Sequence, residues 1–157
     1  MDQRRERPMV ALNAQTRRQS LQDLDGQEWG EAAFGSYVVR TVHSLRRKPL
    51  LDFTVEDLRL MIGQAEGLPY LVPLAIERLQ EDPLVDGDFY PGDLLMAVLK
   101  VESSFWHAHP DLRRAVEGIA RKALTAHIQS DELESRIAKD IEAALVAFLS
   151  DERASAS

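Results

Sequence analysis

The 157-residue chain contains no cysteine, and this absence removes several kinds of chemistry at once. Disulfides, thiolate catalysis and any zinc or iron–sulfur site held by cysteine are excluded. Long hydrophobic runs are missing too: a membrane-spanning helix needs about 20 apolar residues, and the apolar runs here are only a few residues long. The arginine-rich start is not followed by the apolar segment of a secretory signal. We therefore expect a cytoplasmic location and no contact with membranes.

Recognisable catalytic and metal-binding motifs are also absent. The chain has no H-E-x-x-H, no G-x-S-x-G and no phosphate-binding glycine loop. His107 and His109 lack the further ligand that a zinc site requires. A calcium loop counted from Asp86 fails, because Pro91 and Ala97 stand where such a loop needs glycine and glutamate. We expect no catalysis, no cofactor and no metal.

What remains is typical of one soluble globular domain, with 45% hydrophobic and 29% charged residues. Apolar residues recur at spacings of three and four, and no segment alternates between apolar and polar residues for long. This pattern predicts an all-α, single-domain bundle of about seven helices, with the last two long and antiparallel. The helices are expected at about residues 31–47, 54–64, 68–80, 93–101, 105–109, 111–128 and 131–149.

The domain boundaries follow from the same pattern. Residues 20–150 form the expected helical domain, preceded by a poorly ordered segment at residues 1–19 and followed by a frayed tail at residues 151–157. The arginines of the first segment are interpreted as solvated and not as a nucleic-acid site.

Local rules assign structural roles to several residues. Thr54 and Asp57 have the spacing of a capping box at a helix start. Gly67 suits the left-handed conformation that often ends a helix. Gly92 is expected to interrupt the helical conformation before the helix at 93–101.

Charge is distributed unevenly along the chain, whose formal net charge is −7. Residues 51–110 contain eleven acids and three bases, so this third carries a net charge of −8, while residues 1–50 carry +3. A negative field of this kind repels nucleic acid and attracts basic partners.

The most acidic stretch, Glu81 to Leu95, contains five acids and no base. Prolines and glycines interrupt it, so its acids are expected on a turn-rich connection between helices. Phe89 and Tyr90 add aromatic surface. The residues by themselves allow either a solvated turn or a site for a cationic partner.

Two motifs in this region, EDLRLMIGQ (residues 56–64) and GDFYPGDLL (residues 87–95), carry a family resemblance. With their surroundings, from Lys48 to Trp106, they resemble the immunity proteins of contact-dependent growth inhibition (CDI) systems. The resemblance implies a small cytoplasmic protein that binds the C-terminal toxin domain of a cell-surface effector, often a nuclease, and performs no reaction itself. The expected partner is thus a basic toxin domain, and the oligomeric state is left open.

Two roles remain open for the residues of the acidic stretch. As a binding site, it would pair its carboxylates with basic toxin residues and offer aromatic anchors; the candidate toxin-binding residues are Glu81, Asp82, Asp86, Asp88 and Tyr90. As a structural motif, it would use Asp93 to cap the next helix, with Phe89 in the core and Trp106 packed beneath. The alternative function is a helical regulatory module that self-associates and needs no toxin.

Overall fold

The computed structural model describes residues 12–30, 35–126 and 132–156, with the backbone alone for residues 126, 132–134 and 151–156. These residues form nine α-helices, one 3₁₀ helix and no strand. The elements are α1 (Ala14–Arg17), α2 (Leu21–Asp25), α3 (Tyr37–Leu45), η2 (Leu50–Asp52), α4 (Val55–Gly63), α5 (Leu68–Glu81), α6 (Asp93–Leu99), α7 (Ser103–Ala108), α8 (Pro110–Ala126) and α9 (Glu132–Ala156). The all-α prediction is confirmed, and the two helices beyond the expected seven are the short α1 and α2.

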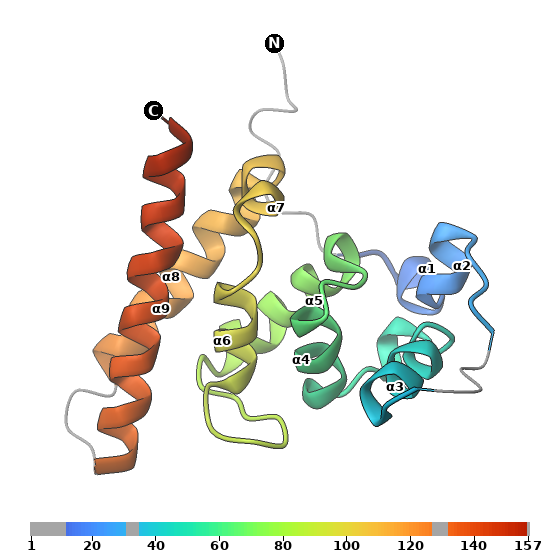
Figure 1. Ribbon diagram of the computed structural model, residues 1–157, viewed down its shortest axis with the longest axis horizontal. Helices are drawn as coiled ribbons and strands as arrows, with labels where there is room; N and C mark the ends of the chain where they lie inside the picture. The colour runs from blue at the N-terminus through green and yellow to red at the C-terminus, as the bar shows by residue number, and fades with distance from the viewer. Residues whose placement is uncertain (1–11, 31–34, 127–131, 157) are drawn as a thin grey trace.

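The helices form three groups along the long axis of the molecule (Figure 1). α4, α5 and α6 pack together at the centre, and α3 joins them through α4. α1, α2 and α3 lie at one end of the molecule, and α8 and α9 lie at the other end. α8 and α9 run in opposite directions, as the sequence predicts for the last two helices. α9 continues to Ala156 and so includes most of the segment expected to be a frayed tail.

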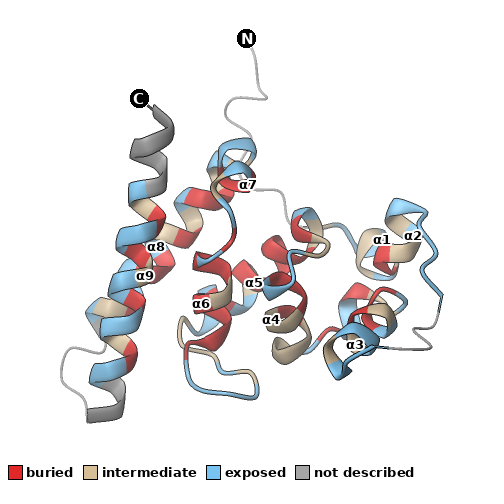
Figure 2. Ribbon diagram, in the orientation of Figure 1, coloured by how far each residue is buried: buried red, intermediate tan, exposed pale blue. Residues whose placement is uncertain are grey.

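The hydrophobic core is centred on α5 and α6. Leu71, Leu79, Leu94 and Val98 are all fully buried, and buried residues follow the inner sides of both helices (Figure 2). Each such side chain contributes about 1.5–3 kcal/mol by leaving water. These two helices are therefore a stable base for the connection between them, which carries the acidic stretch.

α9 covers α6 and α8 with the apolar stripe that the sequence predicts. Ile137, Ile141, Leu145 and Phe148 are buried along it. Trp106 of α7 packs edge-on against Phe148, with ring centroids 5.3 Å apart. Its indole nitrogen donates to the Val101 carbonyl at 3.1 Å. Trp106 is thus a core residue, anchored by α9.

One expectation for the N-terminal part needs correction. α3 begins at Tyr37, not at residue 31, because Gly35 has a φ of 122° and the Ser36 side chain caps the helix by accepting from the Val39 amide. Of the segment at residues 1–19, the structure describes residues 12–19, which include α1. Arg17 of this helix binds Glu77 of α5 through two hydrogen bonds, of 2.6 and 3.0 Å. Residues 1–11 and 31–34 of these predictions lie outside the described residues.

The predicted helix ends are largely right. Thr54 and Asp57 form a complete capping box at α4, and Lys48 adds an ion pair of 2.6 Å to Asp57. Gly67 is left-handed, with a φ of 63°, although it caps the start of α5 and not the end of α4. A Cβ on Gly67 would lie 2.7 Å from a methyl carbon of Leu21. The tight turn between α4 and α5 therefore needs glycine for two reasons.

Replacing Gly67 by alanine should lower the free energy of unfolding by about 1–2 kcal/mol, because it adds a left-handed alanine and a steric clash. Gly118→Ala in α8 is the matched control: no atom lies within 4 Å of its added Cβ, and alanine favours a helix interior by about 0.5–1 kcal/mol. Urea unfolding of both variants measures the difference. Similar values for the two variants would contradict this account of the turn.

Candidate functional site

Residues 82–92, here called the acidic loop, connect α5 to α6. The loop is closed at its neck, where the Gly92 amide donates to the Leu84 carbonyl at 3.1 Å and Asp86 forms an isolated β-bridge with Pro91. Gly92 has a φ of 91° and precedes α6 directly. The loop therefore projects from the core as a closed turn, with exposed residues along its outer side (Figure 2).

Asp93 holds this loop from the inside. Its side chain is only 3% exposed, and its two oxygens accept hydrogen bonds from the Gly87 amide at 2.7 Å and the Phe89 amide at 3.1 Å. The expectation that Asp93 caps the next helix is wrong: it is the first residue of α6, and Gly92 occupies the cap. Its carboxylate turns back into the loop because the loop amides would otherwise have no acceptor.

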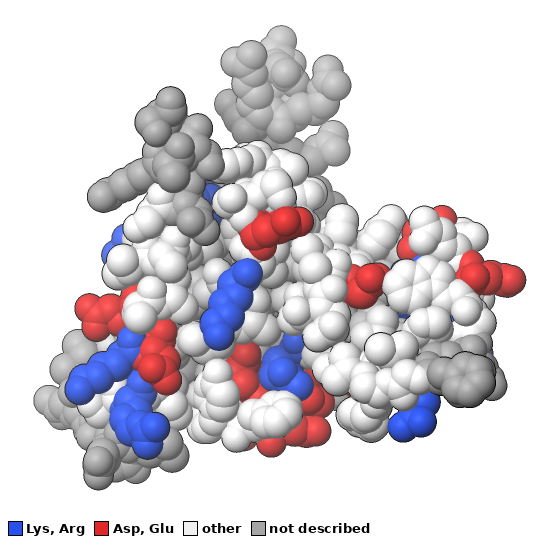
Figure 3. Space-filling model, viewed as in Figure 1, with Lys and Arg blue, Asp and Glu red and all other residues white. Residues whose placement is uncertain are grey.

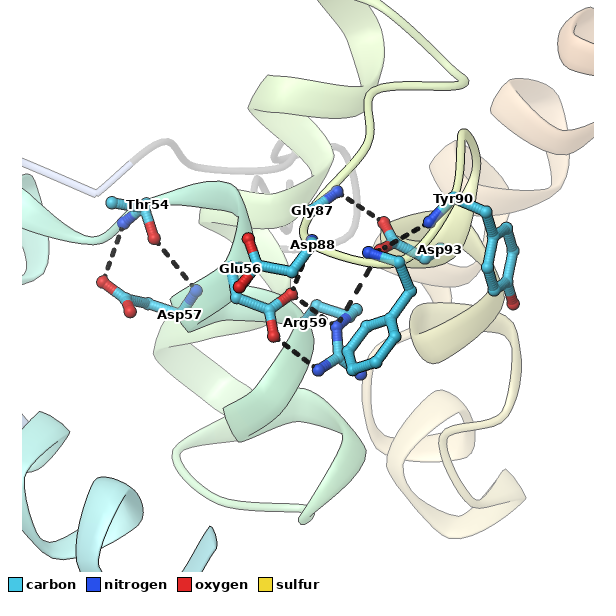
Figure 4. A network of polar contacts seen from close by, with 9 residues as sticks. Thr54, Glu56, Asp57, Arg59, Gly87, Asp88, Tyr90 and Asp93 are labelled. Carbon is cyan, nitrogen blue, oxygen red and sulfur yellow. Dashed lines mark hydrogen bonds and ion pairs between the residues drawn. The ribbon is translucent and has the colours of Figure 1, made fainter. Parts of the chain in front are cut away.

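Glu56 and Arg59 of α4 support the same loop from the other side (Figure 4). The Asp88 amide donates to Oε1 of Glu56 at 3.0 Å. Arg59 binds both oxygens of Glu56, each at 2.6 Å, and its Nε lies 3.9 Å from Asp93. The hydrogen bonds from Arg59, together with the Asp88 amide, lower the pKa of Glu56 below its ordinary value of 4.5. Glu56 and Asp93 thus fix the loop backbone as anions.

Gly87 is required where these anions converge. A Cβ at this position would lie 2.6 Å from Oε1 of Glu56 and 3.1 Å from Oδ2 of Asp93. With any larger residue, either the loop or these carboxylates would have to shift. The glycine that begins the GDFYPGDLL motif is therefore explained by the close approach of α4.

Phe89 does not lie in the core, which corrects the structural role expected for it. Its side chain is 67% exposed, and its ring packs on the guanidinium of Arg59 at 4.3 Å from the ring centroid. The backbone amide of Phe89 is bound to Asp93, while its ring lies over Arg59 and stays exposed. A cation–π contact of this kind holds an exposed ring in place without burying it.

The candidate toxin-binding residues all lie at the surface, along the end of α5 and the acidic loop. Glu81, Asp82, Asp86 and Asp88 are exposed, and Tyr90 is 39% exposed. Burial, followed by the nearby charges of Asp93 and Asp140, raises the pKa of the Tyr90 hydroxyl above 10.0. These residues follow one another along the chain, from the end of α5 through the acidic loop. On the face drawn in Figure 3, acidic atoms gather beside a basic group at the lower edge.

Ion pairs divide the acids of the central third into two groups. Five of these acids form ion pairs: Glu56, Asp57, Glu66, Glu77 and Asp93. Three of their basic partners lie before residue 51. Across the described residues, no ion pair involves Glu81, Asp82, Asp86 or Asp88. Asp52 and Glu102 also form no ion pair with another described residue, so four of the six unpaired acids of this third lie at the end of α5 and on the acidic loop.

A pocket of about 280 Å³ opens beside the loop. Phe89 and Tyr90 form part of its wall, and Met96 and Ala97 contribute apolar surface. Its charged lining residues are Arg59, Lys100 and Asp93. The sequence reasoning missed Glu56, Arg59 and Lys100 as site residues. The first two lie one helical turn apart in EDLRLMIGQ, a spacing at which side chains meet, and that spacing was the available signal for them.

Two further features bear on chemistry and location. Over residues 12–30, 35–126 and 132–156, no group of three or more His, Asp or Glu residues is arranged to hold a metal ion. None of the helices in that part of the chain combines the length and apolarity needed to cross a bilayer.

Comparison with known proteins shows that a family model described as CDI immunity proteins matches residues 23–116. The chain belongs to the CDI immunity proteins. The match extends beyond the stretch from Lys48 to Trp106 that carries the resemblance in sequence, and it runs from α2 into α8. No match was found among curated proteins or among solved structures.

The residues that match the model of the CDI immunity proteins include all those that support the acidic loop. EDLRLMIGQ supplies Glu56 and Arg59, and GDFYPGDLL supplies Gly87 and Asp93, so the two motifs that are separate in sequence meet in one network. α9 lies outside the matched residues.

Replacing Asp93 by alanine should lower the free energy of unfolding by about 2–4 kcal/mol, because two loop amides lose their acceptor. Asp88→Ala removes an exposed carboxylate from the same loop and should change it by less than about 0.5 kcal/mol. Urea unfolding at neutral pH measures both. Equal losses would show that Asp93 does not hold the loop.

The network around Glu56 should also make stability depend on pH. Because the folded pKa of Glu56 is lowered, its contribution is complete above the ordinary value of 4.5 and is lost as the pH falls through the folded pKa. Wild type should therefore be more stable than Glu56→Gln at about pH 7, and this advantage should shrink below about pH 4.5. Urea midpoints over that range test the sign; an advantage that stays constant would contradict it.

Proposed function

We propose that this protein binds the C-terminal toxin domain of its cognate CDI effector in the cytoplasm and neutralises it through the acidic loop. Membership of the CDI immunity proteins supports the general role. The finer proposal is carried by four carboxylates at residues 81–88, which are exposed and without ion pairs among the described residues. One lies at the end of α5 and three on the acidic loop, whose backbone is bound by Glu56 and Asp93.

A rigid loop is an efficient binding element for electrostatic reasons. Its carboxylates need little ordering when a partner arrives, so less conformational entropy is lost on binding. Their negative field also speeds the encounter with a basic surface. Phe89 and Tyr90 add aromatic area beside the charges, and aromatic residues are frequent among the residues that dominate binding energy.

The expected toxin is a nuclease. Nucleases grip the phosphates of their substrate with lysine and arginine side chains, and such a surface is complementary to Asp86 and Asp88. Catalysis has no role in this proposal: binding alone neutralises the toxin, and neither cofactor nor metal is involved.

The proposal is tested first in cells. The C-terminal domain of the effector encoded next to this chain is co-expressed with wild type or with Asp86→Asn/Asp88→Asn. Wild type should restore growth, and the double variant should protect less. Cells that die in the presence of abundant wild-type protein would refute the proposed function.

Purified proteins give the second test, by the association rate at increasing salt. The rate for wild type should fall as salt rises, and Asp86→Asn/Asp88→Asn should lower the rate at low salt by about tenfold. Asp52→Asn/Glu142→Gln is the control: it makes the same change in net charge at exposed residues outside the loop and should have a much smaller effect. A rate that does not depend on salt would remove the electrostatic part of the proposal. A protein that instead forms concentration-dependent oligomers and ignores the toxin would support the self-associating module.

A further inference from the structure

The pocket beside the acidic loop differs from the loop in the sign of its available charge. Arg59 and Asp93 both line it, with opposite charges. The Arg59 guanidinium is already bound to both oxygens of Glu56 and lies 3.9 Å from Asp93, whose oxygens accept the Gly87 and Phe89 amides. Lys100 also lines the pocket. It is exposed, and no ion pair to another described residue involves its ammonium group. Lys100 is therefore the cation that remains available to a partner.

The size of the pocket suits a protein side chain. Its volume of about 280 Å³ falls just below the range of roughly 300–1,000 Å³ for pockets that enclose small-molecule ligands. Met96 and Ala97 provide apolar surface for an aliphatic stem, and Phe89 and Tyr90, which also line the pocket, are exposed. The pocket would hold one inserted side chain beside Lys100.

The aromatic wall of the pocket is fixed before any partner binds. Arg59 holds the Phe89 ring from below at 4.3 Å, and Asp93 holds the backbone amide of Phe89. A side chain that enters the pocket would therefore meet a preformed surface, which lowers the cost of binding.

We propose that this pocket receives an acidic side chain of the toxin, which pairs with Lys100 while basic toxin residues pair with Asp86 and Asp88. The interface would then be bipolar: an acidic loop and a cationic pocket side by side. This rests on the proposed function and adds a feature of the partner to it, namely a Glu or Asp residue next to the basic patch. A bipolar contact also improves specificity, because a toxin with basic residues alone would place like charges at Lys100.

The direction in which one charge reversal changes the affinity for the toxin distinguishes a bipolar interface from a uniformly acidic one. Lys100→Glu makes the protein more acidic, so a purely basic toxin surface should bind it more tightly. The bipolar interface predicts the reverse, a loss of affinity of about tenfold or more, because the pair with Lys100 becomes a repulsion. The measurement is the dissociation constant for the purified cognate toxin domain at fixed salt.

Lys122→Glu on α8 is the matched control, because it makes the same change in net charge. Lys122 is exposed and does not line the pocket. It should leave affinity nearly unchanged or strengthen it slightly. Lys100→Met should weaken binding by about threefold to tenfold, with thermal unfolding close to wild type. Lys100→Arg should retain most of the affinity.

The outcomes distinguish the two proposals. If wild type binds the toxin and Lys100→Glu binds as well or better, the cationic pocket is refuted while the proposed function stands. If wild type does not bind the cognate domain at all, the proposed function fails and this inference fails with it. If Lys100→Glu loses affinity and Lys122→Glu does not, the toxin places an acidic group in the pocket. A Glu→Lys or Asp→Lys change at that toxin residue should then restore binding to the Lys100→Glu variant.

Discussion

The acidic loop depends on two carboxylates that accept its backbone amides. Asp93 and Glu56 together bind the amides of Gly87, Asp88 and Phe89. A loop rich in like charges would otherwise tend to open, because its acidic side chains repel one another and its amides can bond to water instead. The carboxylates of Glu56 and Asp93 thus hold the loop closed while its other acidic side chains remain exposed on the outer surface. Arg59 compensates the inner pair, and it does so from α4, which is buried against α5 and α6.

The partition of charge in the molecule follows from the same arrangement. The net charge of the central third overstates the negative charge that a partner meets, because Arg17, Arg46 and Lys48 from the N-terminal part pair with Glu77, Glu66 and Asp57. What remains without ion pairs among the described residues is concentrated at the end of α5 and on the loop after it. A field confined to one edge can orient an approaching partner, whereas charge spread evenly would attract it without orienting it.

The aromatic residues of the loop show how one contact changes a role. By hydrophobicity alone, Phe89 belongs in a core. The guanidinium of Arg59 provides a surface on which the ring packs while staying accessible. The same guanidinium lines the pocket whose other basic residue is Lys100. Arg59 thus joins the structural network to the pocket, and EDLRLMIGQ and GDFYPGDLL meet at this residue.

The sequence by itself determined the helical class, the approximate position of seven helices, the capping box of α4 and the place of the acidic connection. These features depend on patterns within a few residues of each other, such as the three- and four-residue spacing of apolar side chains and the preference of threonine for a helix start. α1 and α2 escaped prediction because each spans one or two turns, too short to show periodicity.

Only the tertiary structure decided that Asp93 points inward, that Phe89 points outward, and that Arg59 and Lys100 border the loop. The contacts of Phe89 with Arg59 and of the Asp88 amide with Glu56 join residues about 30 positions apart. The hydrogen bonds of Asp93 to the Gly87 and Phe89 amides are short in sequence but depend on the closed shape of the loop. Burial and ion pairing are set by what the folded chain brings together, and local spacing does not contain that information.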